Sequence, residues 1–230
     1  MPSLPVAGRH TGLPLLLLPL LLLLLLNSCS ISLFNGYHHQ ANYTGKAPAS
    51  WFLSDTGHFL FNTKIDLMKN HYSGLMIIKP VTGGSYRVVF ITEVGLKIFD
   101  MEFLPDKQVK VHYLMDAMNK KALIKTLTND ISLVLMNRLS DGQPDVLRHR
   151  NSQDIIYRYR DKSRKSFYHL NEVNDRPYQV KQTAGIINKV KAELYGNPAS
   201  GIDSVKITHY NLRLSINLYR IIEVTNDVAE

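Results

Sequence analysis

Apolar and polar side chains alternate along short segments through much of the chain. Between residues 59 and 67, Phe61 and Ile65 fall on one face of an extended chain, whereas Asn62 and Lys64 fall on the other. This period of two predicts a β-strand with one buried face. Similar segments follow, separated by turn residues, at 72–79, 86–92, 96–104 and 109–114. Short strands that succeed one another in this way predict an antiparallel meander.

The period then changes. Apolar residues recur at intervals of three and four between residues 119 and 139, namely at Leu123, Ile124, Leu127, Ile131, Val134, Leu135 and Leu139. This spacing predicts an amphipathic helix with one apolar stripe. Asp116 or Asn119 can cap the start of the helix, and Asp141–Gly142 can end it.

Strand patterns resume after the helix. They cover residues 154–160, 165–170, 178–183, 187–194, 205–209 and 212–222. The apolar phase of Val205 and Ile207 switches at Leu212, which predicts a bend or bulge near Tyr210–Asn211. The sequence contains no internal repeat.

These elements predict a mainly β fold of about eleven strands with one long helix. A sheet of this size curls, and the apolar stripe of the helix needs an apolar partner. An unclosed antiparallel β-barrel whose concave side is covered by the helix satisfies both requirements. Segments 75–78 and 86–91 are apolar on both faces, as expected for central strands that are covered on both sides.

The N-terminal segment carries a leucine-rich block from Leu13 to Leu26. Crossing a membrane takes about 20 apolar residues, so this block is too short to span comfortably. Arg9 before the block and Asn27–Ser28 after it complete the pattern of a secretory signal. The sequence Leu26-Asn27-Ser28-Cys29 further resembles the bacterial lipobox, although Asn27 departs from its usual small or hydroxyl residue.

The lipobox resemblance implies lipidation of Cys29. In such lipoproteins the thiol carries a diacylglycerol, the signal is cut before the cysteine and the new amine is acylated. The chain would then comprise a signal peptide at 1–28, a lipidated tether at 29–51 and a half-barrel domain at 52–230. An uncleaved anchor and an ordinary secretory signal with an incidental cysteine are the alternatives. Residues 30–230 contain no cysteine, which disfavours a disulfide-bearing secreted domain.

The residue after the cysteine bears on localisation. By resemblance to enterobacterial lipoproteins, Ser30 in place of Asp implies transfer to the outer membrane. Residues 30–40 contain neither Asp nor Glu and so lack a cluster resembling a surface-export signal. We therefore expect a lipid anchor on the periplasmic face of the outer membrane of a Gram-negative bacterium.

Composition and charge exclude other classes. The 230 residues are 45% hydrophobic and 20% charged, which excludes a collagen-like repeat and a charge-rich disordered chain. The formal net charge is +8, and its densest basic stretch is 158–165. No nucleic-acid reader fold accompanies this stretch, so no nucleic-acid partner is expected. We interpret it as a solvated hairpin turn, with contact to anionic head groups as the alternative.

No motif predicts catalysis, a metal or a cofactor. His38–His39 lacks an HExxH or similar partner pattern, and Thr82–Ser85 lacks the Gly-Lys-Ser/Thr of a phosphate loop. No G-x-S-x-G elbow occurs, so a hydrolase is a distant third hypothesis. An aromatic group could line a ligand site, or its members could be paired strand residues: Tyr157, Tyr159, Phe167 and Tyr168.

Three stretches carry a family resemblance. They are Ser73-Gly74-Leu75 with 77–80, the run 86–90 continuing through Gly95 to Phe99, and 207–210 before 212–218. With the lipobox and the order of elements, the chain resembles the LolA/LolB-type superfamily of periplasmic lipoprotein carriers and outer-membrane lipoprotein receptors, including related lipoproteins of the Bacteroidetes.

The resemblance implies a function. The family fold is an unclosed barrel with an apolar cavity for acyl chains, so we expect a non-catalytic lipoprotein that takes acyl chains or lipoprotein cargo from a periplasmic carrier. In the anchored receptors an apolar residue in the turn before the fourth strand assists membrane insertion, and Val94 and Leu96 match it here. The alternative for both residues is packing under the sheet. The alternative function is a non-catalytic scaffolding lipoprotein of an envelope assembly.

Overall fold

The computed structural model describes residues 34–41, 43–45, 47–53, 57–137, 139 and 143–222. The predicted signal peptide and Cys29 lie outside the described residues, and so does the Asp141–Gly142 pair predicted to end the helix. The chain from Gly36 onward forms a compact unit of its own. None of the helices in these ranges combines the length and hydropathy needed to cross a bilayer.

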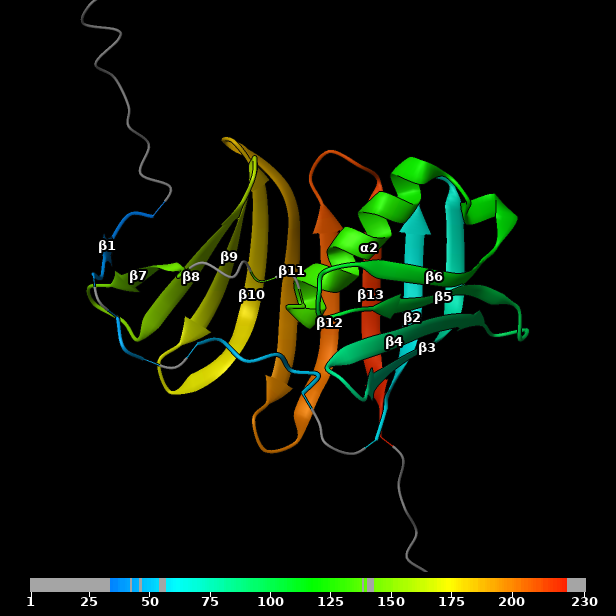
Figure 1. Cartoon of the computed structure of the whole chain (residues 1–230), viewed down its shortest axis with the longest axis horizontal. Helices are drawn as coiled ribbons and strands as arrows, with labels where there is room; N and C mark the ends of the chain where they lie inside the picture. Colours follow the sequence, from blue (N-terminus) through cyan, green and yellow to red (C-terminus); the bar gives the residue numbers. More distant parts are fainter. Residues whose placement is uncertain are drawn as a thin grey trace, which may run out of the picture. The chain divides into compact units, whose positions relative to one another are not determined.

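A single antiparallel sheet dominates this unit (Figure 1). Within the described residues it has thirteen strands, in the order β1-β7-β8-β9-β10-β11-β12-β13-β2-β3-β4-β5-β6. The strands are β1 (Tyr37–His39), β2 (Phe59–Leu67), β3 (Asn70–Val81), β4 (Ser85–Thr92), β5 (Lys97–Phe103), β6 (Val109–Leu114), β7 (Asp145–His149), β8 (Asp154–Asp161), β9 (Arg164–Asn171), β10 (Asn174–Ala184), β11 (Ile187–Asn197), β12 (Gly201–His209) and β13 (Leu214–Ile221).

The strand order confirms the predicted meander. Strands β2 to β6 are neighbours in chain order, and so are β7 to β13. The two runs join where β13 pairs with β2, with Ile216 opposite Ile65. Strands β1 and β6 stand at the two ends of the order, so the sheet does not close on itself. The predicted fold class, an unclosed antiparallel sheet with one long helix, is confirmed.

Two strands were not predicted. β7 is short, and β1 lies inside the segment predicted to be a tether; the two pair, with His38 opposite Arg148. Trp51, at the end of that segment, is buried, and its indole nitrogen donates to the carbonyl of Pro177 at 2.7 Å. Part of the predicted tether therefore packs on the sheet.

The helix is shorter than predicted. It forms α2 (Lys121–Leu135), preceded by the 3₁₀ turn η1 (Asp116–Met118). The predicted cap is wrong, because Lys120 occupies the N-cap position without a side-chain hydrogen bond. Met136 has a φ of 62°, a left-handed conformation that ends the helix.

The predicted bend near Tyr210–Asn211 is instead a turn that reverses the chain. It joins β12 to β13, which pair antiparallel with Thr208 opposite Ser215. The change of apolar phase arises because two strands on either side of a turn start their alternation independently.

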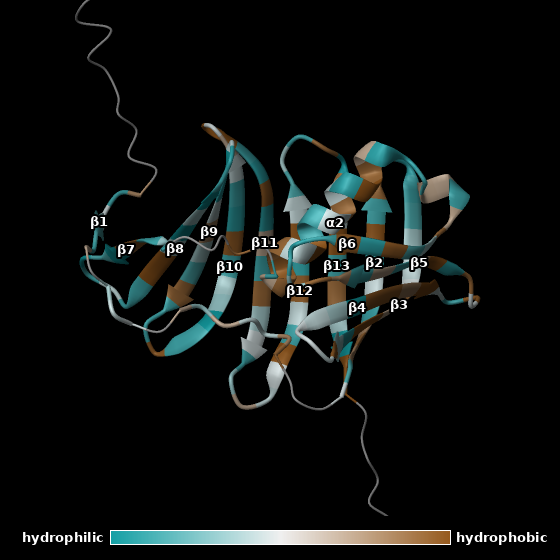
Figure 2. Ribbon diagram, in the orientation of Figure 1, coloured by the Kyte–Doolittle hydropathy of each residue, from teal (hydrophilic) through white to brown (hydrophobic). Residues whose placement is uncertain are grey.

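Helix α2 lies across the concave face of the sheet (Figure 1). The side chains beneath it come from β2, β3, β5, β12 and β13, so the sheet wraps around this helix. The strands alternate between apolar and polar residues along their length (Figure 2). On β2, for example, Phe61 and Ile65 are fully buried while Asn62 and Lys64 are exposed.

Candidate functional site

The space between α2 and the concave face is the predicted binding site. It is almost filled: one cavity of about 10 Å³ remains there. This is the least space that holds one water molecule, and sites for small molecules occupy about 300–1,000 Å³. The cavity is lined by Ile65, Met76, Ile78, Phe99, Leu127, Ile131, Val134, Leu135, Ile207, Ile216 and Leu218. An acyl chain therefore has no room here while α2 stays in place.

Asp130, which borders the apolar stripe of α2, makes a polar contact with the sheet. Its carboxylate lies 2.7 Å from Nε2 of His209, at the end of β12. Asp130 is fully buried, and burial raises the pKa of its carboxyl group, whereas the hydrogen bond with His209 and the charge of Arg164 oppose that rise. This contact fixes the middle of α2 to β12.

A second set of polar contacts lies one residue earlier on the helix. The amide of Asn129 donates to the side-chain oxygen of Gln182 at 3.1 Å. Arg164 donates to the side-chain oxygens of Asn129 at 2.6 Å and of Gln182 at 3.2 Å. We call the Asp130–His209 and Asn129–Gln182–Arg164 contacts the helix latch.

The helix latch is weak compared with the apolar packing. A neutral hydrogen bond contributes about 0.5–1.5 kcal/mol net, and a bond from a charged group such as the Arg164 guanidinium contributes about 1.5–3 kcal/mol. Fully burying one aliphatic side chain contributes about 1.5–3 kcal/mol. Several such side chains of α2 face the sheet, including Leu127 and Ile131. An apolar ligand that replaced α2 against the sheet would supply the larger of the two contributions.

The turn between β4 and β5 carries the predicted membrane-insertion residues. Val94 is 81% exposed and Leu96 is 61% exposed, so the alternative that both pack under the sheet is wrong. The turn is held by its own backbone, since Gly95 donates to the carbonyl of Thr92 at 2.9 Å. Leu96 also donates to the hydroxyl of Thr92 at 3.0 Å. The turn thus presents both side chains to solvent, and their insertion into a membrane stays a prediction.

The aromatic group is a set of paired strand residues. Tyr157 lies opposite Tyr168 across β8 and β9, and the rings of Tyr159 and Tyr168 meet edge to face with centroids 5.7 Å apart. Burial raises the pKa of Tyr159 to about 12. Phe167 neighbours Tyr168 along the strand and therefore points to the opposite face of the sheet.

The basic stretch 158–165 forms the hairpin that was predicted. Asp161 lies opposite Arg164 at the turn between β8 and β9. Arg158 and Arg160 both donate to one oxygen of Asp145, at 2.8–3.0 Å. His39 is 3.7 Å from the other oxygen of Asp145. Among the described residues, no group of three or more His, Cys, Asp or Glu side chains could hold a metal ion.

Comparisons with known proteins add little. No protein-family model and no curated protein sequence matches the chain. A solved domain named for outer membrane lipoprotein sorting, from Vibrio parahaemolyticus, is 13% identical with a TM-score of 0.43, over 80% of this chain and 89% of that one.

A DUF1329 family protein from Desulfovibrio piger is 9% identical with a TM-score of 0.40, over 71% of this chain and 82% of that one. At these identities and TM-scores neither similarity carries information about function.

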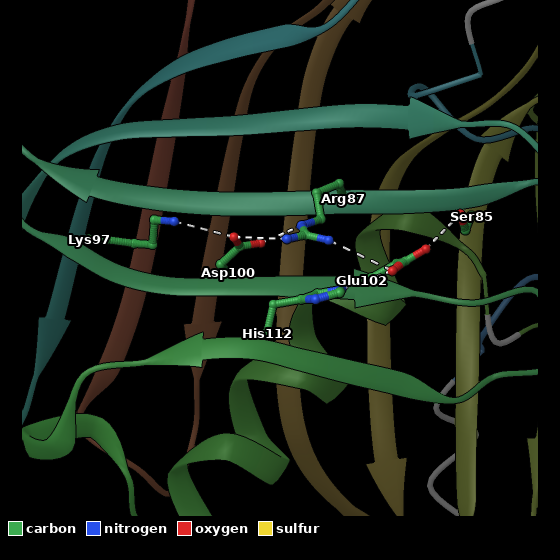
Figure 3. Close-up of polar contacts among 6 residues, drawn as sticks. All are labelled: Ser85, Arg87, Lys97, Asp100, Glu102 and His112. Carbon is green, nitrogen blue, oxygen red and sulfur yellow. Dashed lines mark hydrogen bonds and ion pairs between the residues drawn. The ribbon is translucent and has the colours of Figure 1, made fainter.

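A charged cluster on β4, β5 and β6 was not predicted (Figure 3). Two nitrogens of Arg87 on β4 donate to the carboxylate of Asp100, one of them at 2.9 Å. Lys97 approaches the same carboxylate at 3.5 Å. His112 on β6 lies 2.9 Å from Glu102 on β5. Each carboxylate contacts a side chain on a neighbouring strand, so the cluster clamps three strands together.

The clamp predicts a loss of stability on substitution of Arg87. Arg87→Met leaves the buried carboxylate of Asp100 without its main partner, and we expect a loss of about 2 kcal/mol in urea unfolding at pH 7. Lys79→Met is the matched control, because Lys79 is exposed and lies opposite Arg87 on β3. Equal stability of the two variants would contradict the clamp.

The contacts of Asp100 also make the stability of the folded domain depend on pH. Burial tends to raise the pKa of Asp100, but the hydrogen bonds and charges of Arg87 and Lys97 bring it below its usual value. Because the folded pKa is lower than the unfolded one, this stability is present above about pH 4 and is lost as the pH falls. In Arg87→Met the stability lost between neutral and acid pH should be smaller than in the wild type, measured by thermal unfolding, because burial then acts on Asp100 without its main opposing partner.

Proposed function

We propose that this chain is a lipid-anchored, non-catalytic lipoprotein of the outer membrane whose domain binds an acyl chain between α2 and the concave face of the sheet. The observation that supports it best is the packing of α2. A single helix separates a continuous apolar surface from solvent, and the helix latch is its main polar attachment among the described residues.

Binding requires α2 to move. An acyl chain in water exposes apolar surface that costs about 0.8 kcal/mol per CH₂ group. When α2 withdraws, the acyl chain takes over the contacts that Leu127, Ile131 and Val134 make with the sheet. The closed arrangement keeps the apolar face dry when no cargo is present, and the cargo supplies the free energy that opens it.

The anchor and the partners complete the proposal. Acylated Cys29 holds the chain to the periplasmic face of the outer membrane, and two or more acyl chains attach a protein stably. Cargo arrives from a soluble periplasmic carrier and passes to the leaflet. The exposed side chains of Val94 and Leu96 would enter the leaflet during that step.

A second candidate function has an observation in its favour. The cavity under α2 is only about 10 Å³, as expected for a scaffolding lipoprotein that keeps the fold with a filled interior. In that case α2 would be a fixed part of the core.

Fatty-acid uptake separates the two functions. In residues 30–230, Asn129→Ala removes the amide that links α2 to Gln182 and Arg164. The loss of about 1.4 kcal/mol of helix attachment should raise the affinity for a fluorescent fatty acid about ten-fold. Asn119→Ala, at an exposed position just before α2, is the matched control. If folded wild-type and Asn129→Ala domains both fail to take up the probe, the scaffold is correct.

Lipidation is tested in cells. Cys29→Ala removes the sulfur that accepts the diacylglycerol, so the precursor should stay uncut and free of radiolabelled palmitate. Ser30→Ala leaves the cysteine in place and should be labelled normally. Labelling of the Cys29→Ala chain at the wild-type level would contradict the assignment of Cys29 as the lipid attachment site.

The turn is tested by release of cargo to vesicles. Val94→Ser together with Leu96→Ser removes the two exposed aliphatic side chains, and burial of each would contribute about 1.5–3 kcal/mol. We expect transfer of the fluorescent fatty acid to vesicles to slow about ten-fold, with uptake unchanged. Val173→Ser, at an equally exposed turn position between β9 and β10, should have no effect. Equal slowing by both variants would rule out a specific role for the β4–β5 turn.

A further inference from the structure

A second cleft lies on the side of α2 that faces the β8–β9 hairpin. It has a volume of about 370 Å³, which is in the range for small-molecule sites. α2 forms one wall through Lys125 and Asn129, and the hairpin forms the other through residues 161–164 and Ser166. Gln182 on β10 lies between the two walls. This cleft is separate from the apolar cavity under the helix.

The cleft carries an excess of positive charge. Lys125, Lys162 and Arg164 line it, and Asp161 is the one carboxylate among the described residues that do so. In the helix latch the guanidinium of Arg164 donates to amide oxygens, which are neutral. Arg164 thus places its guanidinium at the cleft wall, although its charge also acts on buried Asp130, and a planar guanidinium is well suited to phosphate oxygens.

Ser132 gives an independent indication of a ligand. This α2 residue is only 1% exposed and lines the cleft, and its hydroxyl has no hydrogen-bond partner among the described residues. Buried hydroxyl groups in folded proteins nearly always have a partner. A ligand oxygen in the cleft would provide one.

An exposed apolar tip stands beside the cleft. The turn between β10 and β11 carries Ile186, which is 89% exposed, and Ile187, which is 55% exposed. The backbone of Gly185 donates to the carbonyl of Ser163 at 3.4 Å, so this turn touches the β8–β9 turn that forms the cleft wall. Figure 2 shows the apolar colouring at this end of the hairpins.

We propose that this cleft binds the phosphate group of an anionic phospholipid at a bilayer surface, while Ile186 and Ile187 enter the acyl layer beside it. Cations next to exposed aliphatic side chains match a lipid whose charged head and apolar chains are adjacent. A free phosphate ion would use the cations and the Ser132 hydroxyl but would leave the isoleucines without a role. The site does not depend on any movement of α2.

Short-chain lipids test this site on the full chain in a non-ionic detergent. Dihexanoylphosphatidylglycerol should raise the melting temperature in a saturable manner, and dihexanoylphosphatidylcholine should not. Lys125→Gln together with Lys162→Gln should raise the apparent Kd for the anionic lipid at least ten-fold. Both lysines are exposed and neither belongs to the helix latch, so the fold is retained. Lys206→Gln, an exposed lysine on β12 outside the cleft, should change the Kd less than two-fold.

Further measurements distinguish a phospholipid head group from free inorganic phosphate as the bound group. Ile186→Ser together with Ile187→Ser should weaken binding of the anionic lipid about ten-fold and leave any binding of inorganic phosphate unchanged. Inorganic phosphate binding as tightly as the lipid would overturn the lipid assignment in favour of a free anion. Equal melting shifts with the two lipids, or an unchanged Kd in the double lysine variant, would overturn the site. A failure of fatty-acid uptake under α2 would leave these results unaffected.

Discussion

The rest of the structure depends on the contact between the apolar face of α2 and the concave face of the sheet. An open sheet of this size has a large apolar face that water would otherwise cover. Side chains from five strands, distant in sequence, reach the same helix. Their common packing sets the curvature of the sheet, because a flatter sheet could not bring Phe99 on β5 and Ile207 on β12 to the same helix.

Much of the architecture could be predicted from the sequence because it follows from local periodicity. The alternation at Phe61 and Ile65 and the helical stripe through Leu127 and Ile131 each reflect one buried face. Strand β1 could not be predicted, since three residues are too few to show a period. Its strand character comes from pairing with β7, which follows it by more than a hundred residues.

The polar contacts around the candidate site could not be predicted from the sequence. Asp130 and His209 are 79 residues apart, and nothing in the local pattern of either residue indicates the other. The charged cluster shows the same limit, because Arg87 and Asp100 are 13 residues apart on different strands and only the pairing of β4 with β5 brings them together. The residual volume under α2 depends on how particular side chains interlock. An amphipathic stripe shows that a helix is covered, but it does not show how much space is left.

The pairing of β13 with β2 has a consequence for how the chain is made. Ser215 bonds to Asp66 across 149 residues, and this ladder is the junction between the two runs of strands. A contact so distant in sequence forms slowly, since a long loop must close before any pairing is gained. During synthesis, the concave face cannot be completed until nearly the whole chain has emerged. The two runs of hairpins, built from neighbouring strands, can therefore form earlier than the junction that joins them.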